Sequence, residues 1–524
     1  MEVDRRLGAD DAFLSDPSGM DAVLARGRPF GDSGYLREQT QAAFTFRLEK
    51  MAAFLPVARP LLTALERAGE PARYRVLGDP LVRYALQQLL TRFVTGRRAA
   101  LAFEVCEAVL AETAHRLTAG ATSGPLRDGS PEARHVGDAS RTPWIWGEGP
   151  RDDMCARAFR HVVAHEYGGA PCAPSAGDVV MLRKATRLLG EILPETSRSA
   201  LGHAHVVGVT PGVGAWRGKS SSSQFRLAGA VFLNRRMFRN PWWVAEALLH
   251  ECLHQKLYDF RHAHSLLARD ARGTGGGTAG GLLDELRKVV ALWNSPGLEA
   301  GNLWDAQRAV AAFHVYVHVA LFSTLAERRA PELRAVYGPP DAPCAMTPSR
   351  TAFERAHYLG EGLRSVCWAE LGPAGRRMVD WLSSVLGAVD PAPPPPGSSL
   401  HLLLDRYLAE ARRIEKVPPA GALVQRLAAL REAEVDSTRA VLTGLGAQEQ
   451  LDVLGCVPAQ PSAQDEGAAF AETRRLIADT LLRLAPDGYS LNSLCPAARV
   501  PPDEMVRQMV EASSRELAVA GGLA

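Results

Sequence analysis

The sequence lacks the features that mark secreted, disulfide-stapled or membrane-spanning proteins. Its eight cysteines are scattered and none forms a CxxC pair, so we expect reduced thiols in a reducing compartment. The first residues, MEVDRRLGADDAF, are charged and contain no apolar stretch, and we expect no signal peptide. We recognise no apolar run near the roughly 20 residues of a membrane span. These absences predict a soluble, cytoplasmic protein with no membrane partner.

The sequence also has no large excess of positive or of negative charge. The formal net charge is +2 over 524 residues, which gives no electrostatic reason to expect a nucleic acid as partner. Lysine is scarce, with six among the 60 basic residues, and Lys256 is one of them. The charge balance likewise gives no reason to expect an anionic membrane as partner.

The length and the apolar pattern predict a helical protein of more than one domain. Apolar residues recur at spacings of three and four from about residue 36 to 118, which is typical of packed amphipathic helices. Two short valine-rich or apolar runs, 203–210 and 228–234, are the best strand candidates. The expected fold class is mainly α with a small β element, and not a double-stranded β-helix.

We predict further helices after the central region and a division into four parts. The helices are expected at 282–293, 304–328, 351–368 and 374–388. The parts are an N-terminal helical region at 1–145, a metal-binding catalytic domain at 146–390, a Pro-rich linker at 391–399 and a C-terminal helical module at 400–524.

The motif with the clearest chemistry is His250-Glu251-Cys252-Leu253-His254. Asn240-Pro241 opens a predicted helix through it, because Asn is a good N-cap and proline suits the first turn. Residues four apart project from one helical face, so His250 and His254 can hold one metal ion, with Glu251 beside it as a general base. The alternative is a pair of core histidines that bond each other or nearby carbonyls.

The third metal ligand decides the class of enzyme, and the residues leave it open. The metzincin histidine is excluded because Phe260 stands at its position. Glu285 in LLDELRK is a gluzincin-like candidate. His314 and His318 share one face of the apolar segment AAFHVYVHVALF, and a buried imidazole needs a partner. We expect His262 and His264 to be exposed.

At this point the residues resemble a known family. LLHECLHQKLYD is similar to the HExxH domain of bacterial peptide-modifying proteins, in which a Lys-Leu pair, here Lys256-Leu257, follows the motif. The resemblance extends to SSSQFRLAGAVFLN, ALWNSP and AFHVYVHVALF, and covers about residues 200–385. It implies an iron(II)- and 2-oxoglutarate-dependent oxygenase that uses O2 to hydroxylate Cβ of a residue in a ribosomally made precursor peptide.

The resemblance also implies roles for particular residues. His318 would be the third iron ligand beside His250 and His254, which departs from the usual two histidines and one carboxylate. Glu251 would ligate the iron directly or hold a ligand or water. The candidates for binding 2-oxoglutarate are Arg308, Arg355 and Lys256 at its distal carboxylate, with Ser222 and Ser223 as hydrogen-bonding residues.

Two other functions stay open. One is a zinc metallopeptidase in which Glu251 activates a metal-bound water and Glu285 is the third ligand. The other is a peptide-binding scaffold with a structural metal. Position alone makes the N-terminal region a candidate for recognising a leader peptide or for forming a homodimer.

Overall fold

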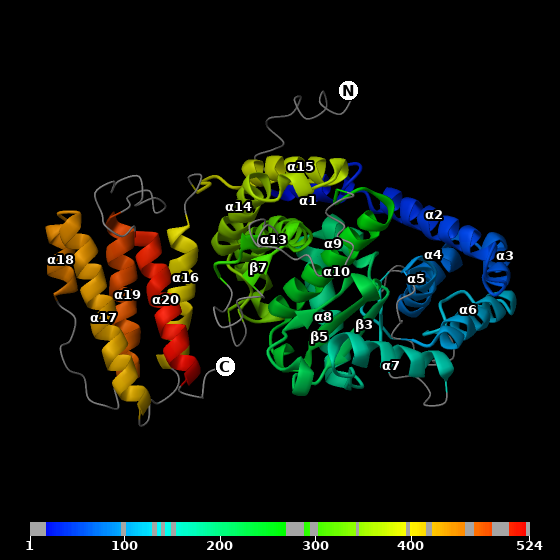
Figure 1. Ribbon diagram of the computed structural model, residues 1–524, viewed down its shortest axis with the longest axis horizontal. Coiled ribbons are helices and arrows are strands. Elements are labelled where there is room, and N and C mark those ends of the chain that lie inside the picture. The colour runs from blue at the N-terminus through cyan, green and yellow to red at the C-terminus, as the bar shows by residue number, and fades with distance from the viewer. Residues whose placement is uncertain are drawn as a thin grey trace. The chain divides into compact units, whose positions relative to one another are not determined.

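The fold is seen in a computed structural model that describes residues 17–95, 101–127, 134–137, 142–147, 153–268, 288–293, 302–341, 345–394, 399–415, 422–455, 466–484 and 502–519. Helices make up most of this part of the chain, and the strands are short (Figure 1). The prediction of a mainly α protein with a small β element is confirmed.

The chain forms two compact units. Unit 1 comprises residues 1–271, 311–353 and 371–391, and unit 2 comprises residues 272–310, 354–370 and 392–524. Residues on both sides of the predicted boundary at 145/146 belong to unit 1. The N-terminal helices therefore pack into the same body as the HExxH helix.

Most of unit 1 is built from helices. They are α1 (Pro17–Arg26), α2 (Ser33–Ala52), α3 (Ala58–Arg67), α4 (Glu70–Gly78), α5 (Pro80–Thr95), α6 (Phe103–Thr118), α7 (Met154–Tyr167), α8 (Ala176–Ile192), α9 (Pro194–Leu201), α10 (Pro241–Ala263) and α15 (Pro373–Val389). Two further helices, α13 (Ala306–Tyr337) and α14 (Ser349–Ser365), have part of their length in each unit.

A sheet of five described strands lies in unit 1, with the order β1-β2-β3-β5-β4. Its strands are β1 (Arg134–His135), β2 (Trp144–Ile145), β3 (Val206–Thr210), β4 (Ser221–Ser222) and β5 (Ala230–Asn234), with the 3-10 turns η1 (Gly214–Trp216), η2 (Phe225–Leu227) and η3 (Arg235–Met237). The central β3 and β5 are parallel and buried throughout, and they fall in the two predicted strand regions. The edge strand β4 runs antiparallel to β5.

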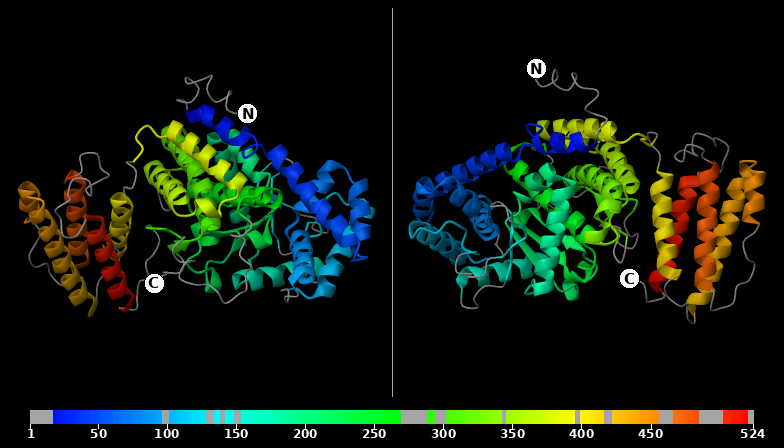
Figure 2. Two further views of the ribbon diagram at one scale, coloured as in Figure 1. Left: turned by 45° about the horizontal axis from the view of Figure 1, so that its top comes forward. Right: turned by 180° about the vertical axis from the view of Figure 1, so that it is seen from behind.

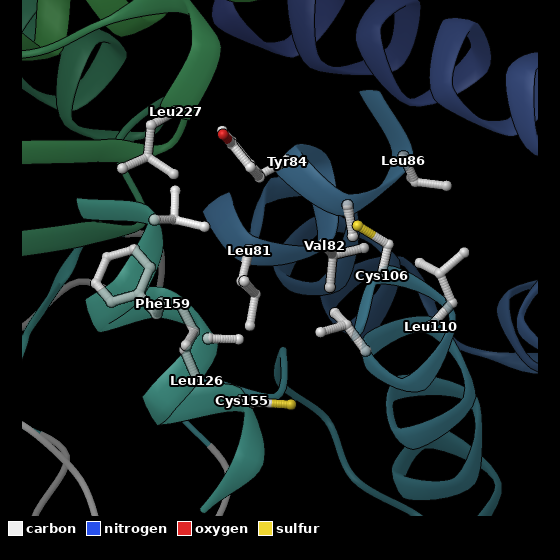
Figure 3. Packing of buried hydrophobic residues seen from close by; sticks show 14 of the residues in the cluster. Leu81, Val82, Tyr84, Leu86, Cys106, Leu110, Leu126, Cys155, Phe159 and Leu227 are labelled. Atoms are coloured by element: carbon white, nitrogen blue, oxygen red, sulfur yellow. The ribbon is translucent and has the colours of Figure 1, made fainter. Parts of the chain in front are cut away.

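Apolar side chains fill the space between α5 and its neighbours. Figure 3 shows Leu81 and Leu86 of α5 pointing toward Phe159 of α7 on one side and Leu110 of α6 on the other. Burial of such side chains stabilises a fold by about 1.5–3 kcal/mol each. This core fixes the N-terminal helices against the sheet.

The helix α13 is longer and more apolar than the sequence analysis recognised. It is the one described helix with the length and composition to cross a membrane, but its most apolar window is mostly buried inside the fold. Such burial is the pattern of a core helix in a soluble protein.

Unit 2 contains a bundle of helices, coloured yellow to red in Figures 1 and 2. The helices are α16 (Leu400–Glu415), α17 (Ala422–Gly444), α18 (Gln448–Leu454), α19 (Glu466–Leu484) and α20 (Pro502–Val519). Their apolar faces form a core of their own, and Arg474 is fully buried between Glu410 and Glu434 at 3.0 Å and 2.5 Å. These helices lie in the range predicted as a C-terminal helical module, 400–524, and unit 2 also includes residues 272–310 and 354–370.

The predicted helix at 282–293 is wrong in its described part. Val289–Val290 forms strand β6, which pairs antiparallel with β7 (Leu303–Trp304). Two adjacent β-branched residues favour an extended backbone. The remaining predicted helices are confirmed as α13, α14 and α15.

Candidate metal centre

Helix α10 carries the HExxH motif, and its start is fixed at several points. The Asn240 side chain accepts a hydrogen bond from the Trp242 backbone N–H at 3.0 Å, as the predicted N-cap requires. The Trp242 indole donates to Gly338 O at 3.0 Å, and the Asn240 amide donates to Pro339 O at 3.3 Å. These bonds tie the first turn of α10 to the segment that follows α13.

The geometry of His250 and His254 fits two ligands of one ion. Their Nε2 atoms lie 3.2 Å apart and both side chains are half-buried. Two nitrogen atoms bound about 2.1 Å from one metal lie roughly 3.4 Å apart at a tetrahedral angle and roughly 3.0 Å apart at a right angle. The observed separation falls between these values, so the two imidazoles need no rearrangement to share an ion.

Glu251 is buried beside this pair. Its Oε1 accepts a hydrogen bond from the Ser221 hydroxyl of β4 at 2.6 Å, and its side chain is 3% exposed. Its Oε2 is buried with no hydrogen-bond partner among the described residues. A buried carboxylate oxygen needs a hydrogen-bond donor or a cation, so this atom can accept a hydrogen bond from a bound group or coordinate it.

Aromatic and hydroxyl side chains border the site. Tyr258 continues the face of His250 and His254, with its ring 6.1 Å from that of His254 and 5.6 Å from that of Phe225. Burial raises the pKa of Tyr258, and the charge of Glu251 adds to this effect. The Ser223 hydroxyl is buried beside this tyrosine, and its hydrogen bond to Tyr258 opposes the rise in the pKa of Tyr258.

Tyr167 of α7 is a second buried tyrosine, and it packs against strand β5. Its ring stacks on Trp216 at 5.1 Å and meets Phe232 edge-on at 4.9 Å. Burial raises its pKa, and the charges of Tyr258 and Glu251 contribute. Its hydroxyl has no hydrogen-bond partner within the described residues.

The two histidines of α13 are deeply buried. His318 Nδ1 donates to His314 O at 2.7 Å, which leaves His318 Nε2 as the atom with a lone pair, and this atom has no partner in the described part of the chain. That tautomer is the one a metal ligand needs. Burial lowers the pKa of His318 to about 3, so the ring is neutral.

Of these two histidines, His314 is the one whose pKa is affected by a histidine of the HExxH motif. Burial lowers its pKa well below the ordinary value, and repulsion from a protonated His318, from Lys256 and from a protonated His254 would lower it further. For His318 only Lys256 contributes in this way. Both histidines therefore stay candidates for the third ligand, as the sequence left them.

The structure places His250 and His254 side by side, but it places no third predicted ligand with them among the described residues. Among the described residues no three His, Cys, Asp or Glu side chains converge in an arrangement that could hold a metal ion. Glu285, the gluzincin-like candidate, lies outside the described residues. The completed site thus requires a further ligand to join His250 and His254.

Lys256 turns into a buried polar network. Its Nζ donates to Gly31 O at 2.7 Å and to the Ser199 hydroxyl at 2.8 Å, and burial lowers its pKa to about 7. The Ser199 hydroxyl lies 2.6 Å from that of Ser33. Lys256 therefore ties α10 to α9 and to the start of α2, and its ammonium is already hydrogen-bonded.

The same network continues to a buried ion pair. Ser33 Oγ lies 2.9 Å from His203 Nε2, His203 Nδ1 lies 2.6 Å from Asp259 Oδ2, and Arg83 donates to Asp259 Oδ1 at 2.7 Å. Serine, histidine and aspartate in this order resemble a nucleophilic triad. All are buried, at 8%, 0% and 2% exposure, so a substrate has no access to Ser33 and the network is structural.

The two arginines predicted to bind 2-oxoglutarate belong to unit 2, and their contacts lie within that unit. Arg355 donates to Asp405 at 3.1 Å and its guanidinium lies 5.3 Å from the Trp293 ring. The Arg308 guanidinium lies 4.9 Å from the Trp304 ring. Their roles toward a ligand stay predictions.

Sequence reasoning missed several residues at the site. Ser221, Tyr258, Phe225 and Tyr167 were not singled out, although the spacing of four from His254 to Tyr258 could have found the second of these. The expectation that His262 and His264 are exposed is wrong. His262 stacks on Phe225 at 4.7 Å, and His264 packs on Phe260 at 4.5 Å.

Comparison with known proteins adds no family to these observations: no protein-family model matches the chain, and no curated protein matches it.

Proposed function

We propose that this protein is an iron(II)- and 2-oxoglutarate-dependent oxygenase that hydroxylates Cβ of a residue in a ribosomally made precursor peptide. The observation that carries the metal site is the 3.2 Å separation of the His250 and His254 Nε2 atoms on one face of α10. The third ligand in this proposal is His318, whose buried Nε2 has no partner in the described residues. The choice of iron and of the co-substrate rests on the resemblance of the motif region.

Iron(II) at this position supplies the capacity to activate O2 together with 2-oxoglutarate and so to oxidise a C–H bond. The chain's own residues position the reactants. Ser221 holds Glu251 in one orientation, and in this proposal Glu251 Oε2 faces the ligand. Tyr258 and Phe225 exclude water from one side of the pair.

The edge strand β4 supports a peptide as substrate. Among the described strands, β4 is paired with β5 alone, and an extended peptide can add to an unpaired edge through main-chain hydrogen bonds. Ser221 of this strand touches Glu251. A peptide bound there passes beside the HExxH face.

A second function, zinc-dependent peptide hydrolysis, is favoured by Glu251 itself. The carboxylate stands beside the histidine pair with one oxygen held by Ser221 and the other without a described partner. A general base that takes a proton from a metal-bound water has this arrangement. The two functions share His250 and His254 and differ in the reaction.

The deciding experiment measures succinate after anaerobic loading with iron(II), followed by 2-oxoglutarate and O2. We expect iron-dependent succinate from the wild type, and a loss of roughly 100-fold or more in His250→Ala. His165→Ala, which changes an exposed histidine of α7, serves as the matched control and keeps activity. Absence of succinate, together with bound zinc and a peptidase activity that Glu251→Gln abolishes, would establish the hydrolase instead.

A further inference from the structure

A groove in unit 1 is lined by three arginines, and none of its described lining residues is acidic. Its volume is about 280 Å³, and its walls come from α8, α9 and the β1–β2 region. The basic residues are Arg183 and Arg187 of α8 and Arg198 of α9, and all three side chains are exposed. The floor includes the buried side chains of Val136 and Leu201.

None of the three guanidinium groups is paired with a carboxylate in the described structure. Arg183 donates to the backbone oxygen of His135 at 3.1 Å. Every acidic side chain of α8 and α9 is engaged elsewhere: Asp178 with Arg235, Glu191 with Tyr337, and Glu195 with Arg26. These carboxylates therefore form no ion pair with the three arginines, although Glu191 stands one helical turn from Arg187 on α8.

Like charges stand close together along α8, and a bound anion would relieve their repulsion. Arg183 and Arg187 stand four residues apart on one helix, a spacing at which like charges destabilise a helix. The groove's hydroxyls do not supply donors, because Thr142, Thr186 and Ser197 already donate to backbone oxygens. An anion bound here would be held by the guanidinium groups.

We propose that this groove binds a small ligand that carries two or three linked phosphate groups. Guanidinium forks match phosphate oxygens in bidentate geometry, and three arginines complement the charge of a di- or triphosphate. The volume lies at the lower end of small-molecule sites and is too small to enclose a peptide segment.

The site is separate from the proposed oxygenase chemistry, and its test needs no activity measurement. Calorimetric titration of the full chain with tripolyphosphate, and then with adenosine triphosphate, should show saturable one-to-one binding that weakens as salt screens the charges. Arg187→Ala and Arg198→Ala should each raise the dissociation constant about tenfold. Arg187→Lys, which keeps the charge and loses the fork, should give an intermediate loss.

The control is Arg157→Ala, which removes an exposed arginine of α7 that does not line the groove. This variant should bind tripolyphosphate like the wild type, and the melting temperature of each variant without ligand verifies that it folds. Unchanged binding in both Arg187→Ala and Arg198→Ala would overturn the proposal. So would an oligoglutamate peptide that binds the groove as tightly as tripolyphosphate, because an acidic peptide would then be the ligand.

Discussion

At the scale of single residues, Asp259 of α10 is a buried carboxylate that pairs with Arg83 and His203. The cation of Arg83 and the hydrogen bond from His203 hold its pKa well below its usual range. We predict that Asp259→Asn lowers the free energy of unfolding by about 3–5 kcal/mol, because it leaves the buried Arg83 without its counter-charge. Urea denaturation measures this change.

The control for that substitution is Asp436→Asn, which breaks an exposed pair with Arg439 in unit 2. An exposed ion pair contributes about 0–1 kcal/mol, so this variant should unfold like the wild type. Equal stability of Asp259→Asn and the wild type would show that the network does not stabilise the fold.

His205 gives a prediction about pH. Burial lowers its pKa to about 3, so the folded protein holds it neutral while the unfolded chain protonates it near pH 6.5. Its contribution to stability is therefore complete above that value and is lost as the pH falls. Between pH 7 and pH 5 the free energy of unfolding should decrease by about 2 kcal/mol on account of this residue.

The measurement is a series of urea titrations at pH 7, 6 and 5. His205→Leu, which cannot bind a proton, should show a decrease that is smaller by that amount. A wild-type stability that stays constant or rises toward pH 5 would contradict the assignment of buried neutral histidines.

At the scale of elements, the local features of α10 were predictable from sequence and its partners were not. The cap at Asn240 and the spacing of His250 and His254 depend on neighbours within a few residues, and the structure shows both. Strand β4 is only two residues long, too short to show a period of two. The hydrophobic pattern of the sequence therefore could not predict the contact between Ser221 and Glu251.

The sequence also could not predict the buried network of Ser33, His203 and Asp259. Ser33 and His203 stand 170 positions apart and meet because α2 and α9 both pack against α10. Hydrophobic periodicity predicts which face of a helix is buried, and it does not predict which distant helix covers that face. The unpartnered atoms at the site, such as His318 Nε2, likewise emerge only from the packed structure.

Gly78, the last residue of α4, gives a prediction about how tightly α4 packs against His205. A Cβ at Gly78 would lie 1.9 Å from the His205 imidazole, which is itself enclosed. Gly78→Ala should therefore destabilise the protein by about 1–3 kcal/mol, since overpacking forces the ring or the helix end to move.

The control is Gly387→Ala in α15, where a Cβ meets nothing within 4 Å. Alanine is the better helix former there and should raise stability by about 0.5–1 kcal/mol. Thermal unfolding of both variants measures the difference, and a Gly78→Ala variant as stable as Gly387→Ala would refute the packing described for this junction.

At the scale of the whole molecule, the chain consists of two units that each have a core. Arg474 is the central charge of the unit 2 bundle, between Glu410 and Glu434. Arg474→Ala leaves two buried carboxylates without their cation and should destabilise that unit by about 3–5 kcal/mol. Differential scanning calorimetry should show one transition moved to lower temperature while the transition of unit 1 is retained.

Wild-type calorimetry serves as the reference for that experiment. A single transition that shifts as a whole in Arg474→Ala would mean that the two units unfold cooperatively, contrary to this description. The result also bears on function, because a metal site confined to unit 1 should survive loss of the bundle's stability.

The central claim is that α10 holds a metal through His250 and His254. The most direct test is equilibrium titration of the full chain with cobalt(II), followed by its visible absorption, in the wild type, His250→Ala, His254→Ala and His165→Ala. The account predicts one bound cobalt with nitrogen-ligand absorption in the wild type and in His165→Ala, and loss of both signals in the other two variants. Unchanged cobalt binding in His250→Ala and His254→Ala would contradict the proposed metal site. It would mean that His250 and His254 are hydrogen-bonded core histidines.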